Sequence, residues 1–153
     1  HQNANLEKLI GMQQSSQVSN LVNYFGMRVE ATGQKMPLEF GQAKFSYSFD
    51  ANVQKSTISI INSKGLTVAS TDGELTVGRH EYVWDGRDKN GIQLPDGDYT
   101  VVVTAQDRDA KLQPVEHTIY GYVRGASADG GKISLFMGNN IQVPLDGIKS
   151  VTQ

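Results

Sequence analysis

The sequence predicts an all-β chain in which a β-sandwich interrupts a small five-stranded β-barrel, behind a short amino-terminal helix. From Met27 onward, apolar and polar residues alternate, which is the period of a strand with one buried face. Turn-forming pairs such as Asp-Gly and Asn-Gly separate these short stretches. The stretch after Pro114 holds only about 40 residues, near the lower limit for an independent core. It therefore needs strands from elsewhere in the chain as partners.

The amino-terminal segment, residues 1–23, predicts a helix or a flexible leader. It is rich in Gln, Asn and Ser, and its apolar residues follow the spacing of a helical stripe, which Gly11 interrupts. We expect this stripe to dock on a partner or on another copy of the chain. The candidate contact residues are Leu6, Leu9, Ile10, Val18, Leu21 and Val22.

Residues 39–113 predict a β-sandwich of the immunoglobulin or fibronectin type. In the first expected strand, Phe45, Tyr47 and Phe49 lie on one face and polar residues on the other. Short strands separated by turn signals at this spacing are typical of such sandwiches. The later strands are expected at Ile58 to Ile60, Leu66 to Val68, His80 to Trp84 and Tyr99 to Ala105.

The two flanking segments, residues 24–38 and 114–153, predict the discontinuous barrel. Neither segment can bury its apolar face alone, so the two must cover each other. We therefore expect strands within residues 24–38 to pair with strands within 115–151, while residues 39–113 form a separate core. The apolar residues concerned are Val29 and Met36 on one side and Ile133, Leu135, Ile141 and Val143 on the other.

The composition excludes several function classes. Lys and Arg number 14 against 16 acidic residues, with a net charge of -2, and no two of the basic residues are adjacent. Phosphate backbones attract clustered positive charge, so nucleic acid is not expected as a partner. The longest apolar runs are far shorter than the roughly 20 residues that cross a bilayer. Because the chain has no cysteine, disulfides and thiolate chemistry are excluded.

Two loops resemble ligand-binding motifs but lack required residues. Asp88 to Gly91 resembles the middle of a calcium loop, yet the first and twelfth ligand positions are Gly86 and Gly97. The segment from Gly125 to Lys132 resembles a phosphate loop, but the lysine comes one residue late and no helix is expected to follow. We therefore interpret the first as a tight turn and the second as a flexible loop.

No catalytic, metal-binding or cofactor-binding residue is predicted. His80 and His117 each lie in an expected strand, and neither has metal-ligand spacing to another histidine. The acidic pairs Asp96 and Asp98, and Asp107 and Asp109, occur in turn-forming contexts. We interpret them as turn and solubility residues rather than as a general acid and base.

Trp84, which is the only tryptophan, leaves two interpretations open. A buried anchor at the end of the sandwich is favoured, because a core of this size needs one large residue to fill its end. The alternative is an exposed platform formed with Tyr82 and Tyr99. Such a platform would make the chain a non-catalytic accessory module of a secreted protein that binds carbohydrate or peptide.

The segment from Gly78 to Tyr99 closely resembles the signature of the flagellar hook-capping protein family. A tryptophan anchors it, Asp-Gly and Asn-Gly pairs turn the chain twice, and a Pro-Asp-Gly sequence turns it again before the next strand. The residues that match the signature are Trp84, Asp85, Gly86, Asp88, Gly91, Leu94, Pro95, Gly97 and Tyr99.

The resemblance extends from about Leu21 to Val151, because segments on both sides of the signature are also similar to this family. It implies a Tudor-like barrel with an inserted fibronectin type III-like domain. Two departures are evident: Ala110 stands at a turn position where glycine is expected, and the family's long leading segment is absent from this sequence.

The resemblance also implies a function. A hook-capping protein is a scaffold at the distal end of the growing hook, where it guides hook subunits into place. The expected partners are hook subunits, further copies of the chain in an oligomeric cap, and the flagellar export apparatus. The expected location is the bacterial flagellum, reached by export from the cytoplasm to the hook tip, which fits a chain without a cleavable leader. No cofactor and no enzymatic activity are implied.

Overall fold

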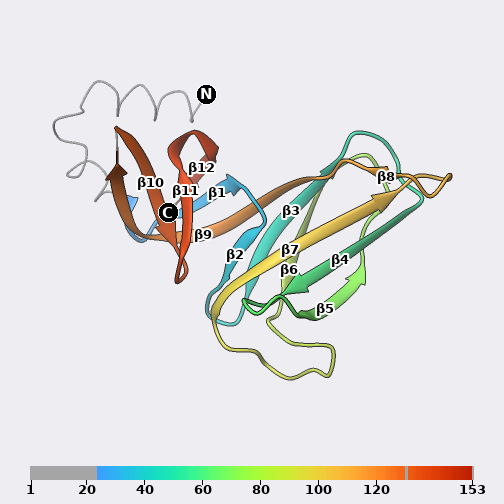
Figure 1. Cartoon of the computed structure of the whole chain (residues 1–153), viewed down its shortest axis with the longest axis horizontal. Coiled ribbons are helices and arrows are strands. Elements are labelled where there is room, and N and C mark those ends of the chain that lie inside the picture. Colours follow the sequence, from blue (N-terminus) through green and yellow to red (C-terminus); the bar gives the residue numbers. More distant parts are fainter. Residues whose placement is uncertain (1–23, 130, 153) are drawn as a thin grey trace.

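The computed structural model describes residues 24–129 and 131–152, and these residues form an all-β fold with two sheets (Figure 1). The predicted all-β fold class, a sandwich inserted into a small discontinuous barrel, is confirmed; the barrel part is an open half-barrel. The helix predicted within residues 1–23 lies outside the described residues. Among the described residues, no helix is long and apolar enough to cross a membrane.

The elements follow one another along the chain as β1 (Arg28–Thr32), β2 (Lys35–Leu38), β3 (Ala43–Phe49), β4 (Lys55–Ile61), β5 (Thr67–Asp72), β6 (Gly78–Trp84), β7 (Gly97–Gln106), β8 (Leu112–Gln113), β9 (Glu116–Asp129), β10 (Lys132–Met137), β11 (Ile141–Pro144), the 3-10 turn η3 (Leu145–Gly147) and β12 (Ile148–Thr152).

The sandwich consists of two layers. One is the sheet β2-β7-β4-β5, with the short β8 paired to β7; the other contains β6, β3 and the beginning of β9. Alternate residues of these strands are buried, as the two-residue period predicts. Phe45 and Ile58, from opposite layers, are among the most completely buried side chains. The aromatic residues of β3 thus fill the sandwich core together with the aliphatic residues of β4 and β7.

The half-barrel is the sheet β11-β10-β9-β1-β12. Its strands bury Val29, Leu135, Met137 and Ile148, each with an exposed fraction of 1% or less. These residues come from β1, β10 and the carboxyl-terminal segment, so sequence positions more than 100 residues apart share one core. This is the mutual cover that the short flanking segments require.

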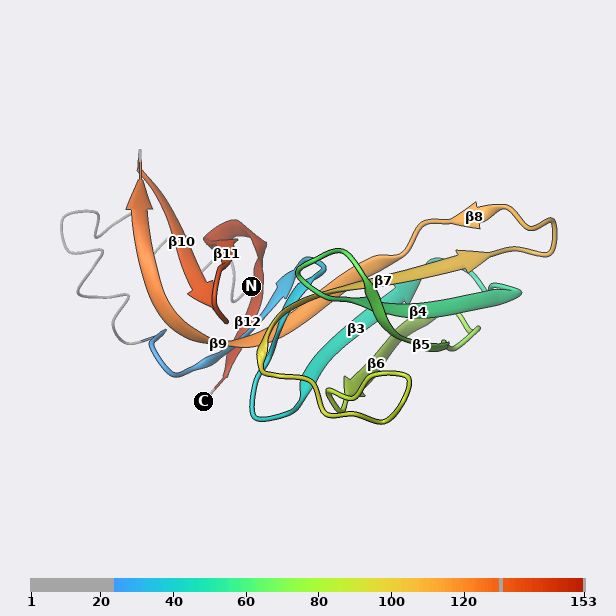
Figure 2. The ribbon, with the colours of Figure 1, turned by 60° about the horizontal axis from the view of Figure 1, so that its bottom comes forward.

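Strand β9 belongs to both parts of the fold. It is 14 residues long, and Figure 2 shows it curving from the sandwich into the half-barrel. Its first residues pair with β3, its middle pairs with β1, and its end pairs with β10. The two parts are therefore joined by a continuous hydrogen-bonded strand rather than by a linker.

The pairing of residues 24–38 differs in part from the expectation. Strand β1 pairs with β9 and β12 in the tail, as expected. Strand β2 instead pairs with β7 in the sandwich, where Met36 lies opposite Tyr99. The reason is local: only the four-residue turn Glu39 to Gln42 separates β2 from β3, so β2 cannot leave the sandwich. The division of the chain into two domains stays a prediction, because β9 is common to both.

The turn after β7 carries the alanine that departs from the family pattern. Ala110 has a φ of +62°, in the left-handed region that costs most residues about 1 kcal/mol. The Asp107 carboxylate compensates by accepting hydrogen bonds from the backbone of Asp109 at 2.9 Å and of Lys111 at 3.0 Å. The acidic residue at position 107 is therefore a turn cap, as its sequence context indicates.

His117 is a half-buried hydrogen-bond acceptor within the sandwich. Its Nε2 atom accepts a hydrogen bond from the backbone N–H of Val103 at 3.0 Å, which ties β9 to β7 across the two layers. Burial lowers the pKa of His117, and a hydrogen bond to the Val115 backbone opposes this shift only in part. Protonation of Nε2 would remove the acceptor, so the neutral ring is the form that fits the fold.

We predict that His117 makes stability pH-dependent. Since its pKa is lower in the folded than in the unfolded protein, its contribution is complete above the unfolded value of about 6.5 and decreases as the pH falls below it. His117→Gln should lower the free energy of unfolding at pH 7.5 by about 1 kcal/mol. The difference between the variant and the wild type should then be smaller at pH 5 than at pH 7.5. Urea titrations at both pH values measure this, and a constant difference between them would contradict the assignment.

Candidate functional site

Trp84 is a buried anchor and not a platform. Only 4% of its surface is exposed, and Tyr99 is buried as well. The two rings meet edge to face with centroids 5.0 Å apart, and the indole N–H donates to the Arg87 carbonyl oxygen at 3.0 Å. The exposed platform of Tyr82, Trp84 and Tyr99, on which the accessory-module alternative depended, is therefore wrong.

The turn from Asp85 to Leu94 uses its acidic side chains as local caps. Asp85 accepts from the backbone N–H of Arg87 at 3.1 Å, and Asp88 accepts from Asn90 at 2.9 Å and from Ile92 at 3.0 Å. One carboxylate oxygen of each residue thus caps the turn's own backbone. In residues 24–129 and 131–152, no group of three or more potential metal ligands occurs.

The other signature residues complete the same turn. Gly86 is required, because a Cβ atom there would lie 2.5 Å from Gln93 and 3.1 Å from the Gly41 carbonyl oxygen. Its own carbonyl oxygen accepts from the N–H of Leu94 at 2.8 Å. Gly91 lies in the left-handed region at φ +81°. Pro95 accepts from the Tyr99 hydroxyl at 2.8 Å, and Gly97 begins β7.

The two strand histidines do not form a catalytic pair. Both lie beside Tyr47, His80 on β6 and His117 on β9, and two strand spacings separate their Cα atoms by roughly 10 Å. His80 Nε2 lies 2.8 Å from the Thr76 carbonyl oxygen, and His117 Nε2 is bound by Val103. Each ring therefore has a structural partner of its own.

Asp96 and Asp98 have a role that their sequence context did not indicate. Asp96 accepts from the backbone N–H groups of Phe40 at 2.9 Å and Gly41 at 3.1 Å. Asp98 accepts from Asn139 at 2.9 Å and Asn140 at 2.8 Å. Both carboxylates cap turn backbone more than 40 residues away in sequence, a long-range role that the turn-forming context alone did not indicate. The Asp98 contact joins the sandwich to the β10–β11 turn of the half-barrel.

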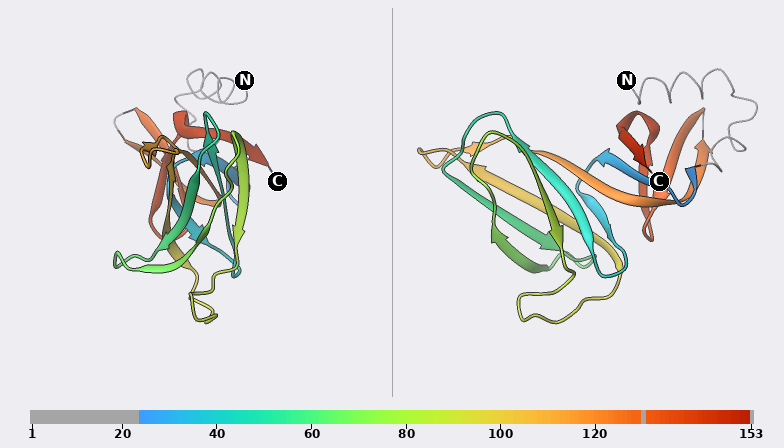
Figure 3. Two further views of the ribbon diagram at one scale, coloured as in Figure 1. Left: turned by 90° about the vertical axis from the view of Figure 1, so that its right-hand side faces the viewer. Right: turned by 180° about the vertical axis from the view of Figure 1, so that it is seen from behind.

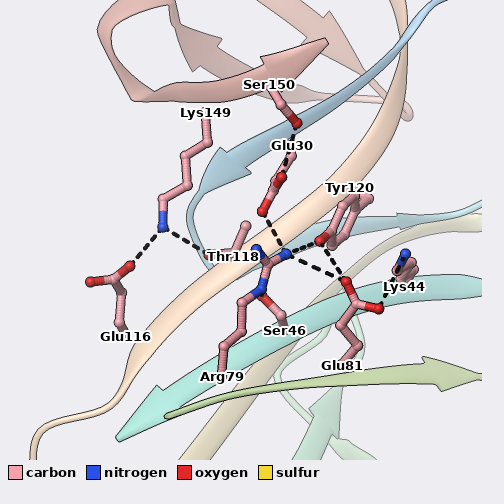
Figure 4. Close-up of polar contacts among 10 residues, drawn as sticks. All are labelled: Glu30, Lys44, Ser46, Arg79, Glu81, Glu116, Thr118, Tyr120, Lys149 and Ser150. Atoms are coloured by element: carbon pink, nitrogen blue, oxygen red, sulfur yellow. Dashed lines mark hydrogen bonds and ion pairs between the residues drawn. The ribbon is translucent and has the colours of Figure 1, made fainter. Parts of the chain in front are cut away.

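A second set of polar contacts crosses the junction on the outer face of the sheet (Figure 4). The Arg79 guanidinium on β6 reaches across β3 and β9 to Glu30 on β1, with an N–O distance of 2.6 Å. On the way, its Nε atom donates to the Ser46 hydroxyl at 3.2 Å. Glu30 also accepts from the Ser150 hydroxyl at 2.9 Å. This chain of contacts links strands β6, β3, β1 and β12.

Tyr120 is the central hydroxyl of this set. It accepts from Arg79 and donates to Glu81 at 3.3 Å, and the Lys44 ammonium lies 4.6 Å from its ring centroid. Burial and the nearby Glu30 charge raise the pKa of Tyr120 to about 12. The phenol therefore stays protonated at physiological pH and acts as a fixed donor.

A further ion pair lies on the same outer face of the sheet (Figure 4). Lys149 on β12 donates to Glu116 at 2.6 Å and to the Thr118 hydroxyl at 3.2 Å, both on β9. The hydrogen bond and charge of Lys149 lower the pKa of Glu116. Exposed pairs of this kind contribute about 1 kcal/mol or less, so the pair adds little to the β1–β12 ladder that holds β12 in place.

Glu39 caps β9 where the strand changes partners. At Tyr122 the strand has left β3 and has not yet reached β10, and the Tyr122 N–H donates to the Glu39 carboxylate at 3.3 Å. The Arg124 guanidinium lies 3.9 Å from the same carboxylate. Burial raises the pKa of Glu39, although the Tyr122 contact and the Arg124 charge oppose the shift.

Phe40, which the sequence analysis did not select, is an exposed aromatic residue at the tip of the β2–β3 turn. Its exposed fraction is 85%, and its φ of +56° is in the left-handed region. Its ring meets the Tyr122 ring edge to face, with the two centroids 6.5 Å apart. The Arg28 guanidinium lies over the Tyr120 ring, 5.2 Å from its centroid. The sequence signal that could have identified Phe40 is the Phe-Gly pair between two stretches of alternating apolar and polar residues.

A polar groove of about 440 Å³ runs beside Phe40. It is lined by residues of β1, β3, β6 and β9, among them Arg28, Lys44, Val83 and Tyr122. Aromatic and arginine side chains of this kind are enriched at the energetic centres of protein interfaces. The arrangement can therefore hold and orient a protein partner. The six apolar residues predicted as contacts, from Leu6 to Val22, lie outside the described residues.

Comparison with known proteins shows similarity to FlgD proteins. The chain is 29% identical over 147 residues to the basal-body rod modification protein FlgD of Escherichia coli K12. This alignment covers 90% of the chain and 62% of that relative. The chain is 26% identical over 110 residues to the FlgD of Salmonella typhimurium, which covers 70% of this chain and 46% of the relative. The chain thus spans about half to two thirds of the length of these relatives.

Two crystal structures share the fold. FlgD from P. aeruginosa aligns with a TM-score of 0.73 at 19% identity, covering 84% of this chain and 97% of that one. FlgD from Xanthomonas campestris, described as giving insights into the hook capping essential for flagellar assembly, aligns with a TM-score of 0.71 at 19% identity, covering 89% and 99%. Residues 33–109 match the family model of the FlgD Ig-like domain. Because this match covers half of the chain, the protein belongs to the FlgD family of hook-capping proteins.

Proposed function

We propose that this chain is the core of a scaffold that caps the growing flagellar hook and guides hook subunits into place at its distal end. Membership of the FlgD family supports this proposal, as does the similarity to FlgD proteins along 90% of the chain. The partners are hook subunits and further copies of the chain in an oligomeric cap. The chain is made in the cytoplasm and reaches the hook tip through the flagellar export apparatus.

The observation that carries the proposal is the junction between the sandwich and the half-barrel. A cap that positions subunits needs surfaces held at a constant angle, and it needs no chemistry. Strand β9 alone would allow bending at Tyr122, where it changes partners. The caps by Asp98 and Glu39 oppose bending at this point. Hydrogen bonds to charged groups contribute about 1.5–3 kcal/mol each, so these few contacts suffice to favour one orientation.

A non-catalytic role fits the polar groups of the described residues. The carboxylates of Asp88, Asp96 and Asp98 are occupied by backbone N–H groups, and Glu30 is paired with Arg79. Such groups are fixed in place and serve to hold structure. The proposal therefore assigns this chain the action of positioning other subunits rather than of transforming a substrate.

We predict that loosening the junction impairs hook assembly. In the full-length protein, Asp98→Ala removes both backbone caps on the β10–β11 turn, so hooks should form much less often in a strain that lacks its own copy. Asp109→Ala, in the exposed turn after β7, is the matched control and should restore hooks fully. Electron microscopy of isolated hooks, with immunoblots of the exported protein, measures the outcome.

Deletion of Phe25 to Val151 from the same full-length protein tests the function as a whole. Hooks that grow normally without this core would show that the scaffold role lies elsewhere in the protein. Hooks at the wild-type frequency with Asp98→Ala would instead contradict only the role of the junction.

We predict that Phe40→Gly separates stability from function. Glycine relieves the left-handed strain of about 1 kcal/mol, partly offset by its greater freedom when unfolded. The free energy of unfolding should therefore stay the same or rise by up to about 1 kcal/mol, whereas hook formation should fall because the exposed ring is lost. Leu66→Ser, at another exposed apolar turn residue, is the control. Wild-type hook numbers with Phe40→Gly would rule out a contact role for the ring.

A further inference from the structure

We propose that Asn90 is a deamidation site that the folded turn keeps unreactive, and that the Asp88 side chain holds this turn closed. This inference does not rest on the proposed function. It comes from three observations: the residue that follows Asn90, the conformation of the turn around it, and the hydrogen bonds that this turn makes.

The sequence around Asn90 favours the reaction. Asn90 is the only asparagine in the chain that a glycine follows. The backbone nitrogen after an asparagine is the nucleophile in deamidation, and glycine hinders its approach least because it has no Cβ atom. Both residues are exposed, and both views of Figure 3 show the loop between β6 and β7, in yellow-green, projecting from the sandwich. Water therefore has access to the pair.

The reaction consumes water and releases ammonia. The Gly91 nitrogen forms a bond to Cγ of Asn90 and loses its proton, while the Cγ–Nδ2 bond breaks and ammonia departs, which leaves a cyclic imide. Water then opens the imide. Cleavage between the nitrogen and Cγ gives aspartate, whereas cleavage between the nitrogen and the main-chain carbonyl carbon gives isoaspartate. No oxidant or reductant takes part.

The folded turn holds Asn90 in a conformation from which the imide cannot close. The Gly91 N–H donates to the Asp88 carbonyl oxygen at 2.9 Å, so residues 88–91 form a β-turn. Neither Lys89 nor Asn90 has a positive φ, which makes this hydrogen-bonded turn type I, with a ψ of about 0° at its third residue. This ψ directs the Gly91 nitrogen toward the nitrogen of Asn90. Imide formation requires it to point toward Cβ instead.

Hydrogen bonds reinforce this protection. The proton that Gly91 must lose is the one donated to the Asp88 carbonyl oxygen, and amides bonded in this way react with solvent only after local opening. The Asp88 carboxylate also accepts from the N–H of Asn90 at 2.9 Å and of Ile92 at 3.0 Å. Hydrogen bonds to a charged acceptor are stronger than neutral ones. The Asp88 side chain therefore fixes the backbone on both sides of the reactive peptide bond.

Reaction at this site would reach the buried core. In isoaspartate the main chain runs through the side chain and gains a methylene group, so the turn cannot re-form with the same contacts. The Gly91 carbonyl oxygen accepts from the Arg87 guanidinium at 2.9 Å, and the Arg87 carbonyl oxygen holds the Trp84 indole N–H. The closed turn thus protects the contacts of Trp84 as well as Asn90.

The turn after β7 provides a matched control. The Asp107 carboxylate accepts from the backbone of Asp109 at 2.9 Å and of Lys111 at 3.0 Å, and its carbonyl oxygen accepts from the Ala110 N–H at 2.9 Å. These bonds repeat those of Asp88 position for position. Residue 109 carries no side-chain amide, however, so this turn has the same cap without the reactive asparagine.

Peptide mass spectrometry of the 153-residue chain, incubated at mildly alkaline pH in buffer and in concentrated urea, measures the conversion of Asn90. The wild type should react about tenfold or more slowly in buffer, because only the open fraction of the turn reacts. Asp88→Ala removes two charged hydrogen bonds and should raise the rate in buffer about tenfold, with no change in urea. Asp107→Ala should match the wild type in both conditions.

Asp88→Asn keeps an acceptor without its charge and should give an intermediate rate in buffer. It also serves as the test if Asp88→Ala loses its fold, which circular dichroism reveals. The proposal is overturned if the wild type reacts equally fast in buffer and in urea. It is equally overturned if Asn90 in urea reacts no faster than Asn62, which a serine follows, or if folded Asp88 variants react like Asp107→Ala.

Discussion

Strand β9 is the constraint on which both parts of this fold depend. Its 14 residues supply a partner to β3 in the sandwich and to β1 and β10 in the half-barrel. Neither part has a complete core without it, because Ile119 and Val123 of this one strand are both buried. A linker between two finished domains would allow free motion. A shared strand instead couples the two parts, because the position of β9 in the sandwich constrains its position in the half-barrel.

The polar contacts at the junction follow from what β9 leaves unpaired. Where the strand passes from one partner to the next, the Tyr122 N–H has Glu39 as its acceptor, and the β10–β11 turn has Asp98. Backbone N–H groups left without a strand partner need acceptors, and carboxylates supply strong ones at neutral pH. The same contacts that satisfy the backbone therefore also fix the angle between the two parts. In such a scaffold, the groups that stabilise the fold also determine how accurately its surfaces are positioned.

Much of the fold could be predicted from alternation and turn chemistry alone, since Phe45, Tyr47 and Trp84 lie buried where their period placed them. The pairing of β1 with the tail followed from the small size of the flanking segments. The pairing of β2 with the sandwich could not be predicted from alternation. Strand β2 is buried on both faces, so its sequence does not show the two-residue period. The roles of Asp96 and Asp98 also escaped, since their partners are more than 40 residues distant. Local context cannot indicate contacts that only the folded chain creates.

The central claim is that the sandwich and the half-barrel keep one fixed orientation. Because the chain has no cysteine, Leu66→Cys in the sandwich and Lys132→Cys in the half-barrel can be spin-labelled selectively, and both positions are exposed. Double electron–electron resonance then measures the distribution of distances between the labels. The account predicts a single narrow distribution that broadens when Asp98 is replaced by Ala. A broad or bimodal distribution without that replacement would contradict it.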